Sequence, residues 1–284
     1  MIHQYKSNGY NIVMDVESGA VHVVDDVTYD VIALFEDTEI SKIVEQLSDK
    51  YDKADIEEAI SEVNQLKEDG QLFTQDIYQP FIEEFKDKRQ TVVKALCLHI
   101  AHDCNLACKY CFAEEGEYHG RRAMMSFEVG KKALDFLVAN SGSRVNLEVD
   151  FFGGEPLMNW DVVKQLVEYG RSLEEPNHKK FRFTLTTNGV LLNDEIMEYL
   201  NKEMSNVVLS LDGRKEVNDR MRPFRTGKGS YDLIVPKFQK LAESRNQSNY
   251  YVRGTFTRDN LDFSEDVKHF ADLGFKQMSI EPVV

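Results

Sequence analysis

Short apolar segments alternate with amphipathic helical segments from residue 94 to the end of the chain, and this alternation limits the fold more than any other feature. The apolar segments have the length and the β-branched and aromatic content of strands, while the helical segments repeat apolar residues every three or four positions. Strands separated by helices pair in parallel through right-handed crossovers. The sequence therefore predicts an α/β unit with strands at 94–101, 144–152, 180–187, 206–211, 250–257 and 277–283, and helices at 126–140, 160–173, 193–203, 230–244 and 264–274.

Six repeats favour a partial (β/α)6 TIM-like barrel over an open doubly wound sheet, although periodicity alone does not separate the two. Pro236 falls inside the fourth expected helix and must kink it or define its start, because proline removes a helical hydrogen bond. The chain ends directly after the sixth strand without a closing helix. We therefore expect 94–284 to be a barrel truncated after that strand, in an N-terminal fragment of a longer protein.

The predicted strands separate polar from apolar residues, because successive side chains point to opposite faces. A packed barrel interior would be filled by Val, Ile and Leu, so a polar inner face indicates a polar ligand near the strand ends. The polar faces carry Glu148 and Asp150, then Ser210 and Asp212 beside Val208, then Arg253, Thr255 and Thr257, and last Ser279 and Glu281. The opposite faces, which helices would cover, carry Leu147, Val149, Phe151, Val207, Leu209, Leu211, Val252, Phe256, Met278 and Ile280.

Residues 1–75 form a second pattern. An alternating run over 10–24 is interrupted by Glu17-Ser18-Gly19 and predicts a β-hairpin. Three amphipathic helical segments follow, the last of which covers 56–66 and ends before Gly70. Two or three strands with three helices suggest a small winged-helix-like α+β domain. Residues 76–93 are polar with scattered aromatic side chains, and we interpret them as a linker.

Charge and composition exclude several classes of partner. The formal net charge of −15 argues against nucleic acid, which needs a basic face, and against an anionic membrane surface. The N-terminal residues contain no apolar signal segment, and no apolar run approaches the ~18 residues of a membrane span. A cytoplasmic location is the default, and clustered cysteines in that compartment are typical of metal or catalytic sites rather than disulfides.

Three of the four cysteines, Cys104, Cys108 and Cys111, lie within eight residues after the first predicted strand of the α/β unit. Four thiolates would close a zinc site or ligate an iron–sulfur cluster completely. Three leave one iron of a four-iron cluster open to a substrate or cofactor. The alternative is a three-cysteine zinc site completed by His102 or His119. Cys97, on the first strand, is interpreted as a small buried hydrophobic residue.

The C-x3-C-x2-C spacing, with Tyr110 before the third cysteine, resembles the radical S-adenosylmethionine (SAM) superfamily over about 94–284. The resemblance implies a [4Fe–4S] cluster on these cysteines, SAM on the open iron, an external electron donor, and a 5′-deoxyadenosyl radical that abstracts hydrogen. It also implies SAM-binding roles. Gly153, Gly154 and Glu155 match a motif that holds the SAM amino group, Asn188 lies in a matching "LTTNG" strand end, Ser210 would contact the ribose, and Arg253 would contact the carboxylate.

The hairpin-plus-helices pattern of 1–75 resembles PqqD-like recognition elements, which bind leader peptides of ribosomal precursor peptides. A leader would add a strand at the hairpin edge, facing the acidic third helix. The combination resembles SPASM/twitch peptide maturases, and most nearly the SCIFF-peptide family, which forms a thioether between a cysteine sulfur and an α-carbon. No cysteine follows Cys111, so the auxiliary clusters and SPASM domain of that family are absent from this sequence.

Two alternatives remain. One is a sulfatase-maturing type of radical SAM oxidase, which would not need a leader-binding module. The other, from a different class, is a zinc-stabilised peptide-binding module without enzymatic activity. Asp212 and Glu281 are the candidates for a general base, and the sequence does not decide between them.

Overall fold

The structure is a computed structural model that describes residues 1–88 and 92–283. It divides into two compact units, Met1–Gln90 and Thr91–Val284. Each unit has its own cluster of buried apolar side chains. Across the described residues, no helix combines the length and the apolar character needed to cross a membrane.

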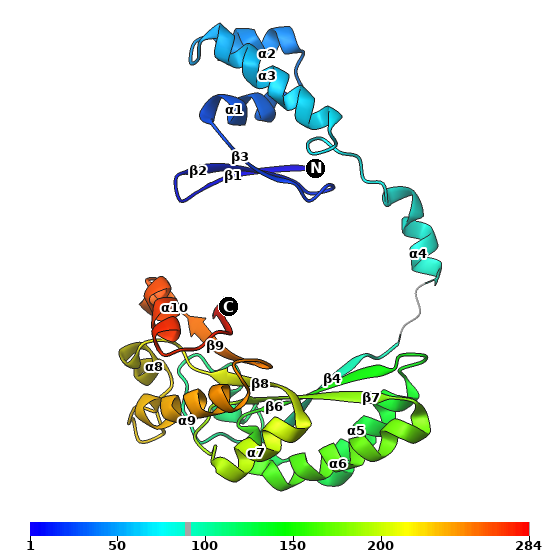
Figure 1. Ribbon diagram of the computed structural model, residues 1–284, viewed down its shortest axis with the longest axis vertical. Helices are drawn as coiled ribbons and strands as arrows, with labels where there is room; N and C mark the ends of the chain where they lie inside the picture. Colours follow the sequence, from blue (N-terminus) through cyan, green and yellow to red (C-terminus); the bar gives the residue numbers. More distant parts are fainter. Residues whose placement is uncertain (89–91, 284) are drawn as a thin grey trace. The chain divides into compact units, whose positions relative to one another are not determined.

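The N-terminal unit places a three-stranded antiparallel sheet before three helices (Figure 1). The predicted hairpin is present, with Asn11 opposite Val24 in its register, and an additional strand precedes it. Val13, Val31 and Ile56 are fully buried between the sheet and the helices. The winged-helix assignment stays a prediction. The elements are β1 (Ile2–Ser7), β2 (Tyr10–Asp15), β3 (Val21–Val24), α1 (Asp26–Leu34), α2 (Ile40–Leu47) and α3 (Lys53–Glu68).

The segment interpreted as a linker, 76–93, contains local helical structure. A 3-10 turn, η1 (Gln79–Phe81), runs directly into α4 (Ile82–Lys88). Pro80 lies in the first turn of this segment, where its missing N–H costs no helical hydrogen bond. Residues 89–91 lie outside the described part of the chain, so the boundary between linker and barrel stays a prediction.

The C-terminal unit holds a seven-stranded sheet with the order β10-β9-β8-β7-β6-β4-β5. Six strands pair in parallel in the order of the sequence, and each crossover leads to the next neighbour. An open doubly wound sheet would reverse direction at a switch point, so this order is that of a partial (β/α)6 barrel. The strands are β4 (Ala95–His102), β5 (Ala123–Met124), β6 (Asn146–Gly153), β7 (Lys180–Thr187), β8 (Met204–Ser210), β9 (Tyr250–Phe256) and β10 (Met278–Pro282).

Helices cover the outer face of this sheet, and the predicted division of polar and apolar faces is confirmed (Figure 1). Leu147, Val149 and Phe151 of β6 are almost completely buried against the helices, as are Val207 and Leu209 of β8. The polar residues that alternate with them along each strand face the inside of the barrel. The covering helices are α5 (Phe127–Ala139), α6 (Trp160–Asn177), α7 (Asp194–Glu203), α9 (Tyr231–Ser244) and α10 (Phe263–Asp272).

One strand and one α-helix of the C-terminal unit were also missed by the sequence interpretation. The short antiparallel strand β5 pairs with the end of β4, and α8 (Lys215–Met221) follows β8. Both are short, so neither has room for a clear apolar period. Pro236 lies inside α9 rather than at its start, because the helix already begins at Tyr231.

Candidate functional site

Residues 104–111, which we call the cysteine segment, leave the barrel at the carboxyl end of β4, where the loops of parallel α/β units gather their functional residues. Cys104 is 9% exposed, and Cys108 and Cys111 are half-buried. The three cysteines line one cavity of about 440 Å³, which we call the cysteine cavity. Its wall also includes the predicted cofactor-binding residues Tyr110, Gly153, Gly154, Glu155, Asn188, Ser210 and Arg253. The structure therefore brings together residues from five separate strand ends and loops.

The two glycines allow the end of β6 to pack against the loop after β4. A Cβ on Gly154 would lie 2.1 Å from the carbonyl oxygen of Asp103, and one on Gly153 would lie 2.5 Å from that of Ala101. Gly153 also has a φ of 124°, a conformation that favours glycine. In the sequence interpretation these glycines belong to a motif that holds the SAM amino group. The structure shows that both positions need glycine for close backbone packing, and this packing holds the cysteine segment in place.

Glu155 joins the ends of β6 and β7 below the cavity. Its Oε1 accepts hydrogen bonds from Leu157 N (3.0 Å) and from the Thr187 hydroxyl (2.9 Å), and its Oε2 accepts one from Asn188 N (2.8 Å). Burial raises the pKa of the Glu155 carboxyl, and these donors oppose that rise. Oε2, with its single bond among the described residues, is the atom that can accept from an ammonium group in the cavity.

Asn188 fastens the cysteine segment to β7. Its Nδ2 donates to Asn105 Oδ1 (2.8 Å) and lies 3.5 Å from Cys104 Sγ. Its Oδ1 accepts from Val190 N, which fixes the orientation of the amide. Asn188 therefore positions a cysteine as well as lining the cavity, a role that its place in the sequence did not indicate.

Segment 221–225 pairs with the cysteine segment, and the sequence interpretation missed it. Ala107 N donates to Pro223 O (2.8 Å) and Lys109 N donates to Met221 O (2.9 Å). A β-bridge between Leu106 and Phe224 continues this antiparallel pairing. One signal for it was available, since "RMRPFR" places three arginines within six residues of an acidic chain.

Arg225 completes this contact from the solvent side. Its Nη2 donates to the carbonyl oxygen of Cys104 (2.6 Å) and to Asp103 Oδ1 (2.8 Å). Its Nε also lies 3.4 Å from a carboxylate oxygen of Glu115. Arg225 thus holds the backbone of the first cysteine while two carboxylates balance its charge.

Tyr110, Asp212 and Arg222 form a polar cluster at the wall of the cavity, which Tyr110 and Arg222 line. The Tyr110 hydroxyl donates to the Asp212 carboxylate (2.8 Å to Oδ2) and accepts from Arg222 Nη1 (2.5 Å). Thr255 N also donates to Asp212 Oδ1 (3.2 Å). Asp212 is 1% exposed and does not line the cysteine cavity. A structural role is the simpler account of this carboxylate, although the sequence interpretation made it a candidate base.

Arg253 and Ser210 meet at the mouth of the cavity, because they are register partners on β9 and β8. Arg253 Nη2 forms a 2.6 Å ion pair with Glu281 Oε2 on the neighbouring strand β10. Both side chains are partly exposed, at 40% and 47%. The guanidinium therefore already holds a carboxylate, and it can exchange this partner for the carboxylate of a ligand.

Cys97 does not occupy the buried position that was expected for it. It is exposed inside the barrel, as the register partner of Asp150. Both residues line a separate cavity of about 600 Å³ at the opposite end of the strands. Asp150 Oδ1 is buried there without a hydrogen-bond partner among the described residues, and burial raises the pKa of this carboxyl to about 6. Strand alternation explains why Cys97 is not buried. Its neighbours Leu96 and Leu98 lie on the apolar face of β4, so Cys97 lies on the opposite face.

The zinc alternative finds little support in the geometry. Within 1–88 and 92–283, no group of three or more His, Cys, Asp or Glu side chains converges on a position for a single ion. His119 is paired with Glu114 (2.8 Å) and its side chain is 75% exposed, while the ring of His102 packs on Tyr118. Three thiols spread around a shared cavity instead fit a larger iron–sulfur cluster, for which cysteine thiolates are the usual ligands.

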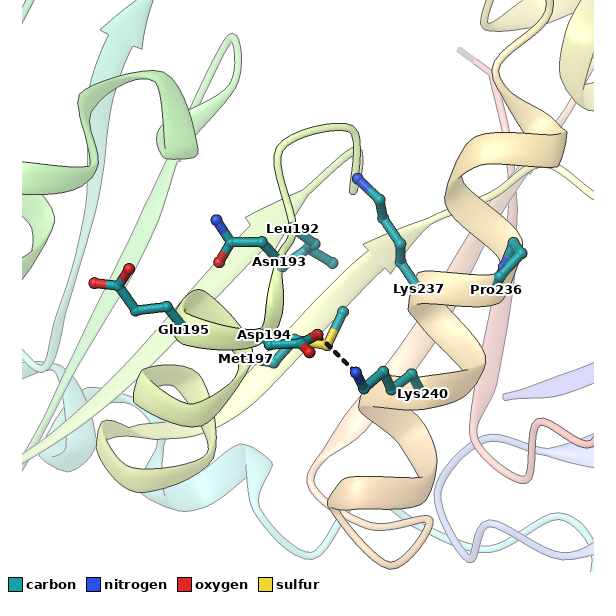
Figure 2. A pocket seen from close by; sticks show the side chains of 8 residues that line it. All are labelled: Leu192, Asn193, Asp194, Glu195, Met197, Pro236, Lys237 and Lys240. Atoms are coloured by element: carbon teal, nitrogen blue, oxygen red, sulfur yellow. Dashed lines mark hydrogen bonds and ion pairs between the residues drawn. The ribbon is translucent and has the colours of Figure 1, made fainter.

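A hollow on the outside of the barrel, between α7 and α9, is a weaker candidate (Figure 2). Its volume is about 630 Å³. Asp194 and Lys240 pair across it (2.6 Å), and Lys237 donates to the backbone oxygen of Val190. Its lysines are thus engaged in structural contacts, and none of the cysteines lines it.

Sequence comparison identifies relatives of the barrel. The profile of the Radical SAM superfamily matches residues 98–279. The radical SAM cyclopropyl synthase TigE of Paramaledivibacter caminithermalis is 27% identical over 191 residues, which cover 63% of this chain and 39% of TigE.

Two solved structures share the fold. One is anSMEcpe with bound AdoMet, which has also been solved with the Kp18Cys peptide; its TM-score is 0.60 at 21% identity, over 68% of this chain and 52% of that chain. The other is Streptococcus suis SuiB bound to S-adenosylmethionine, with a TM-score of 0.52 at 16% identity, over 100% of this chain and 62% of that chain. The chain thus spans less than two thirds of each of these three proteins.

Proposed function

The chain belongs to the radical SAM superfamily, and from this premise we propose that it modifies a ribosomal precursor peptide, using a [4Fe–4S] cluster and SAM bound in the cysteine cavity. The observation that carries the proposal is the shared wall of that cavity. Cys104, Cys108 and Cys111 lie around the same space as Glu155, Asn188, Ser210 and Arg253. Soft thiolates and a separate set of polar groups in one cavity match a cluster with an organic ligand beside it.

The chain's own residues fit these groups. The three cysteine thiolates would hold the cluster, and Arg222, which lines the same cavity, has a buried Nε without a hydrogen-bond partner among the described residues. Glu155 Oε2 would accept from the amino group of SAM, and Arg253 would exchange Glu281 for its carboxylate. When bound, cluster and SAM supply one-electron cleavage of SAM and abstraction of a hydrogen atom from an unactivated C–H bond.

The N-terminal unit supports a peptide as the substrate. β3 is an edge strand, and Val21 and Val23 are 59% and 65% exposed. A groove of about 600 Å³ runs beside it, lined by β3 together with Glu62, Gln65 and Leu66 of α3. An extended leader peptide can add a strand to such an edge and place alternate side chains in the groove. Basic side chains of the leader would pair with the carboxylate of Glu62.

The finer assignment is formation of a thioether between a cysteine sulfur and an α-carbon of the precursor. It rests on the combination of leader-binding unit and barrel, which a sulfatase-maturing oxidase would not need. No cysteine follows Cys111, so any auxiliary cluster would have to be built from residues outside this sequence. SAM cleavage is accordingly the activity to test in this chain.

The test is anaerobic reconstitution with iron and sulfide, reduction in the presence of SAM, and quantification of 5′-deoxyadenosine. The proposal predicts 5′-deoxyadenosine from the wild-type protein and from Cys97→Ala, which keeps the three cavity cysteines. Binding of one zinc per chain, with no iron–sulfur absorbance and no SAM cleavage, would favour the zinc-stabilised peptide-binding module instead.

A further inference from the structure

Cys108 and Arg222 occupy directly opposite positions in the pairing between the cysteine segment and segment 221–225. The hydrogen bonds from Ala107 to Pro223 and from Lys109 to Met221 bracket this pair on both sides. In an antiparallel pairing, opposite residues between two hydrogen-bonded pairs have the closest side chains, with Cβ atoms about 4.5–5.5 Å apart. The backbone therefore directs the guanidinium of Arg222 toward the central cysteine.

The charge of Arg222 is buried and only partly balanced. Its side chain is 11% exposed, and its Nε has no hydrogen-bond partner among the described residues. The Tyr110 hydroxyl accepts a hydrogen bond from Arg222 Nη1. Asp212 Oδ1 lies 3.6 Å from the same nitrogen, which is an ion pair but beyond hydrogen-bond distance. A buried charge with an unsatisfied donor is costly unless an anionic group completes its surroundings. Arg222 also lines the cysteine cavity, where the cluster would supply that group.

Arg222 lies nearer to the cavity than its counter-charge does. Arg222 lines the cysteine cavity together with Cys108, whereas Asp212 does not line it. The pair therefore presents the positive charge of Arg222 to the space that the cluster would fill. A positive field stabilises added negative charge, and it does so most in a buried site, where the effective dielectric constant is low.

We propose that Arg222 is a positioning residue for the iron–sulfur cluster, whose buried positive charge raises the potential at which the cluster accepts an electron. This inference rests on the proposed function. One-electron reduction by an external donor adds one negative charge to a cluster already held by three thiolates. Net charge, burial and contacts around the sulfurs are the protein's means of setting such potentials.

The experiment is a redox titration, followed by electron paramagnetic resonance, of reconstituted wild type and four variants: Arg222→Gln, Arg222→Lys, Asp212→Asn and Arg225→Gln. Circular dichroism and iron content are measured on each. Arg222→Gln should shift the midpoint potential to a more negative value, and Arg222→Lys should keep it near that of the wild type. Asp212→Asn removes the counter-charge, so its potential should shift to a more positive value.

Arg225→Gln is the matched control, because Arg225 holds the same segment but is 35% exposed and is flanked by two carboxylates. Its shift should be clearly smaller than that of Arg222→Gln. Equal shifts in the two variants would show that loosening the segment, not the buried charge, is responsible, and would overturn the inference. If Arg222→Gln loses its iron and Arg222→Lys retains it, the result supports the inference. If both variants fold but lose their iron, the result contradicts the inference.

Asp212→Asn keeps the inference testable if Arg222→Gln does not fold, since an unchanged or more negative potential in this variant overturns it. The two proposals fail in different ways. A wild-type protein that binds no iron contradicts the proposed function and this inference together. A wild-type protein that binds the cluster, with a potential insensitive to the charge at position 222, contradicts this inference alone.

Discussion

Arg253, which lines the cysteine cavity, forms a 2.6 Å ion pair with Glu281 on the neighbouring strand β10. With side chains 40% and 47% exposed, such a pair contributes only about 0–1 kcal/mol to stability. The carboxylate of a bound ligand can therefore displace Glu281 at little cost. Arg253 is thereby available to a ligand carboxylate at the mouth of the cavity.

Arg253→Lys should weaken SAM binding by about 1–3 kcal/mol, because lysine keeps the charge but loses the planar fork. Ser210→Ala, at the register partner of Arg253, should cost about 0.5–1.5 kcal/mol, as expected for a neutral hydrogen bond. Isothermal titration of reconstituted protein with SAM measures both. Equal affinities of wild type and Arg253→Lys would place the carboxylate partner elsewhere.

Gly154→Ala should destabilise the barrel by about 1–3 kcal/mol or more, because its Cβ would lie 2.1 Å from the Asp103 carbonyl oxygen. Urea unfolding followed by circular dichroism gives the free energy of unfolding. Gly120→Ala is the control, since the nearest atom to its Cβ lies at 3.4 Å and its φ is not positive. Similar losses in the two variants would contradict the packing role of Gly154.

Tyr110→Phe should lower the free energy of unfolding by about 1.5–3 kcal/mol, because its hydroxyl bonds to two buried charged groups, Asp212 and Arg222. Tyr199→Phe is a matched control, since the Tyr199 hydroxyl makes one long bond of 3.5 Å to a backbone oxygen. Urea unfolding of both variants at one pH makes the comparison. A Tyr110→Phe protein as stable as Tyr199→Phe would show that the buried cluster contributes nothing.

Asp150 predicts a pH dependence of stability. Burial raises the pKa of its carboxyl from 3.8 to about 6, so between these values the folded protein binds more protons than the unfolded chain. Its contribution to stability therefore falls as pH rises from about 4 to 6, and it stays low above pH 6. Asp150→Asn should gain stability relative to wild type across this range. Unfolding measured at pH 4, 5, 6 and 8 tests this, and a constant difference between the two proteins would refute it.

Leader binding at the β3 edge predicts an alternating sensitivity to proline in the peptide. Proline at a leader position that donates to β3 removes a ladder hydrogen bond, whereas proline at the next position faces away. A proline scan, titrated by fluorescence anisotropy against the whole chain, should show weakened binding at every second position. Salt should weaken binding only modestly, far less than for a DNA-binding protein. Uniform loss along the leader would argue against strand addition.

The strands and most of the helices could be predicted because each carries its own period. Apolar alternation in β6 and β8 also fixed which side faces the helices, as the burial of Leu147 and Val207 confirms. The same rule would have placed Cys97 inside the barrel with Asp150, had it been applied to β4. The cysteine segment and the glycine pair were recognisable because their spacing in the sequence is itself distinctive.

The contacts that position the site could not be predicted, because they join residues far apart in the chain. Arg222 meets Tyr110 and the cysteine segment only once β4 and β8 lie in the same barrel. The cluster of arginines in "RMRPFR" marks the segment, but it does not distinguish Arg222 from an exposed arginine. Likewise, Asp212 is one polar residue at a strand end, and its burial under Tyr110 depends on the fold of both segments.

The central claim is that Cys104, Cys108 and Cys111 hold one [4Fe–4S] cluster. The most direct test is the iron and acid-labile sulfide content of anaerobically reconstituted wild type, Cys97→Ala, and the variant with all three cavity cysteines changed to Ala. We predict about four iron and about four sulfide per chain in the first two proteins and neither in the third, because only thiolates at these positions ligate the cluster. Full iron and sulfide loading in the triple variant would contradict the account.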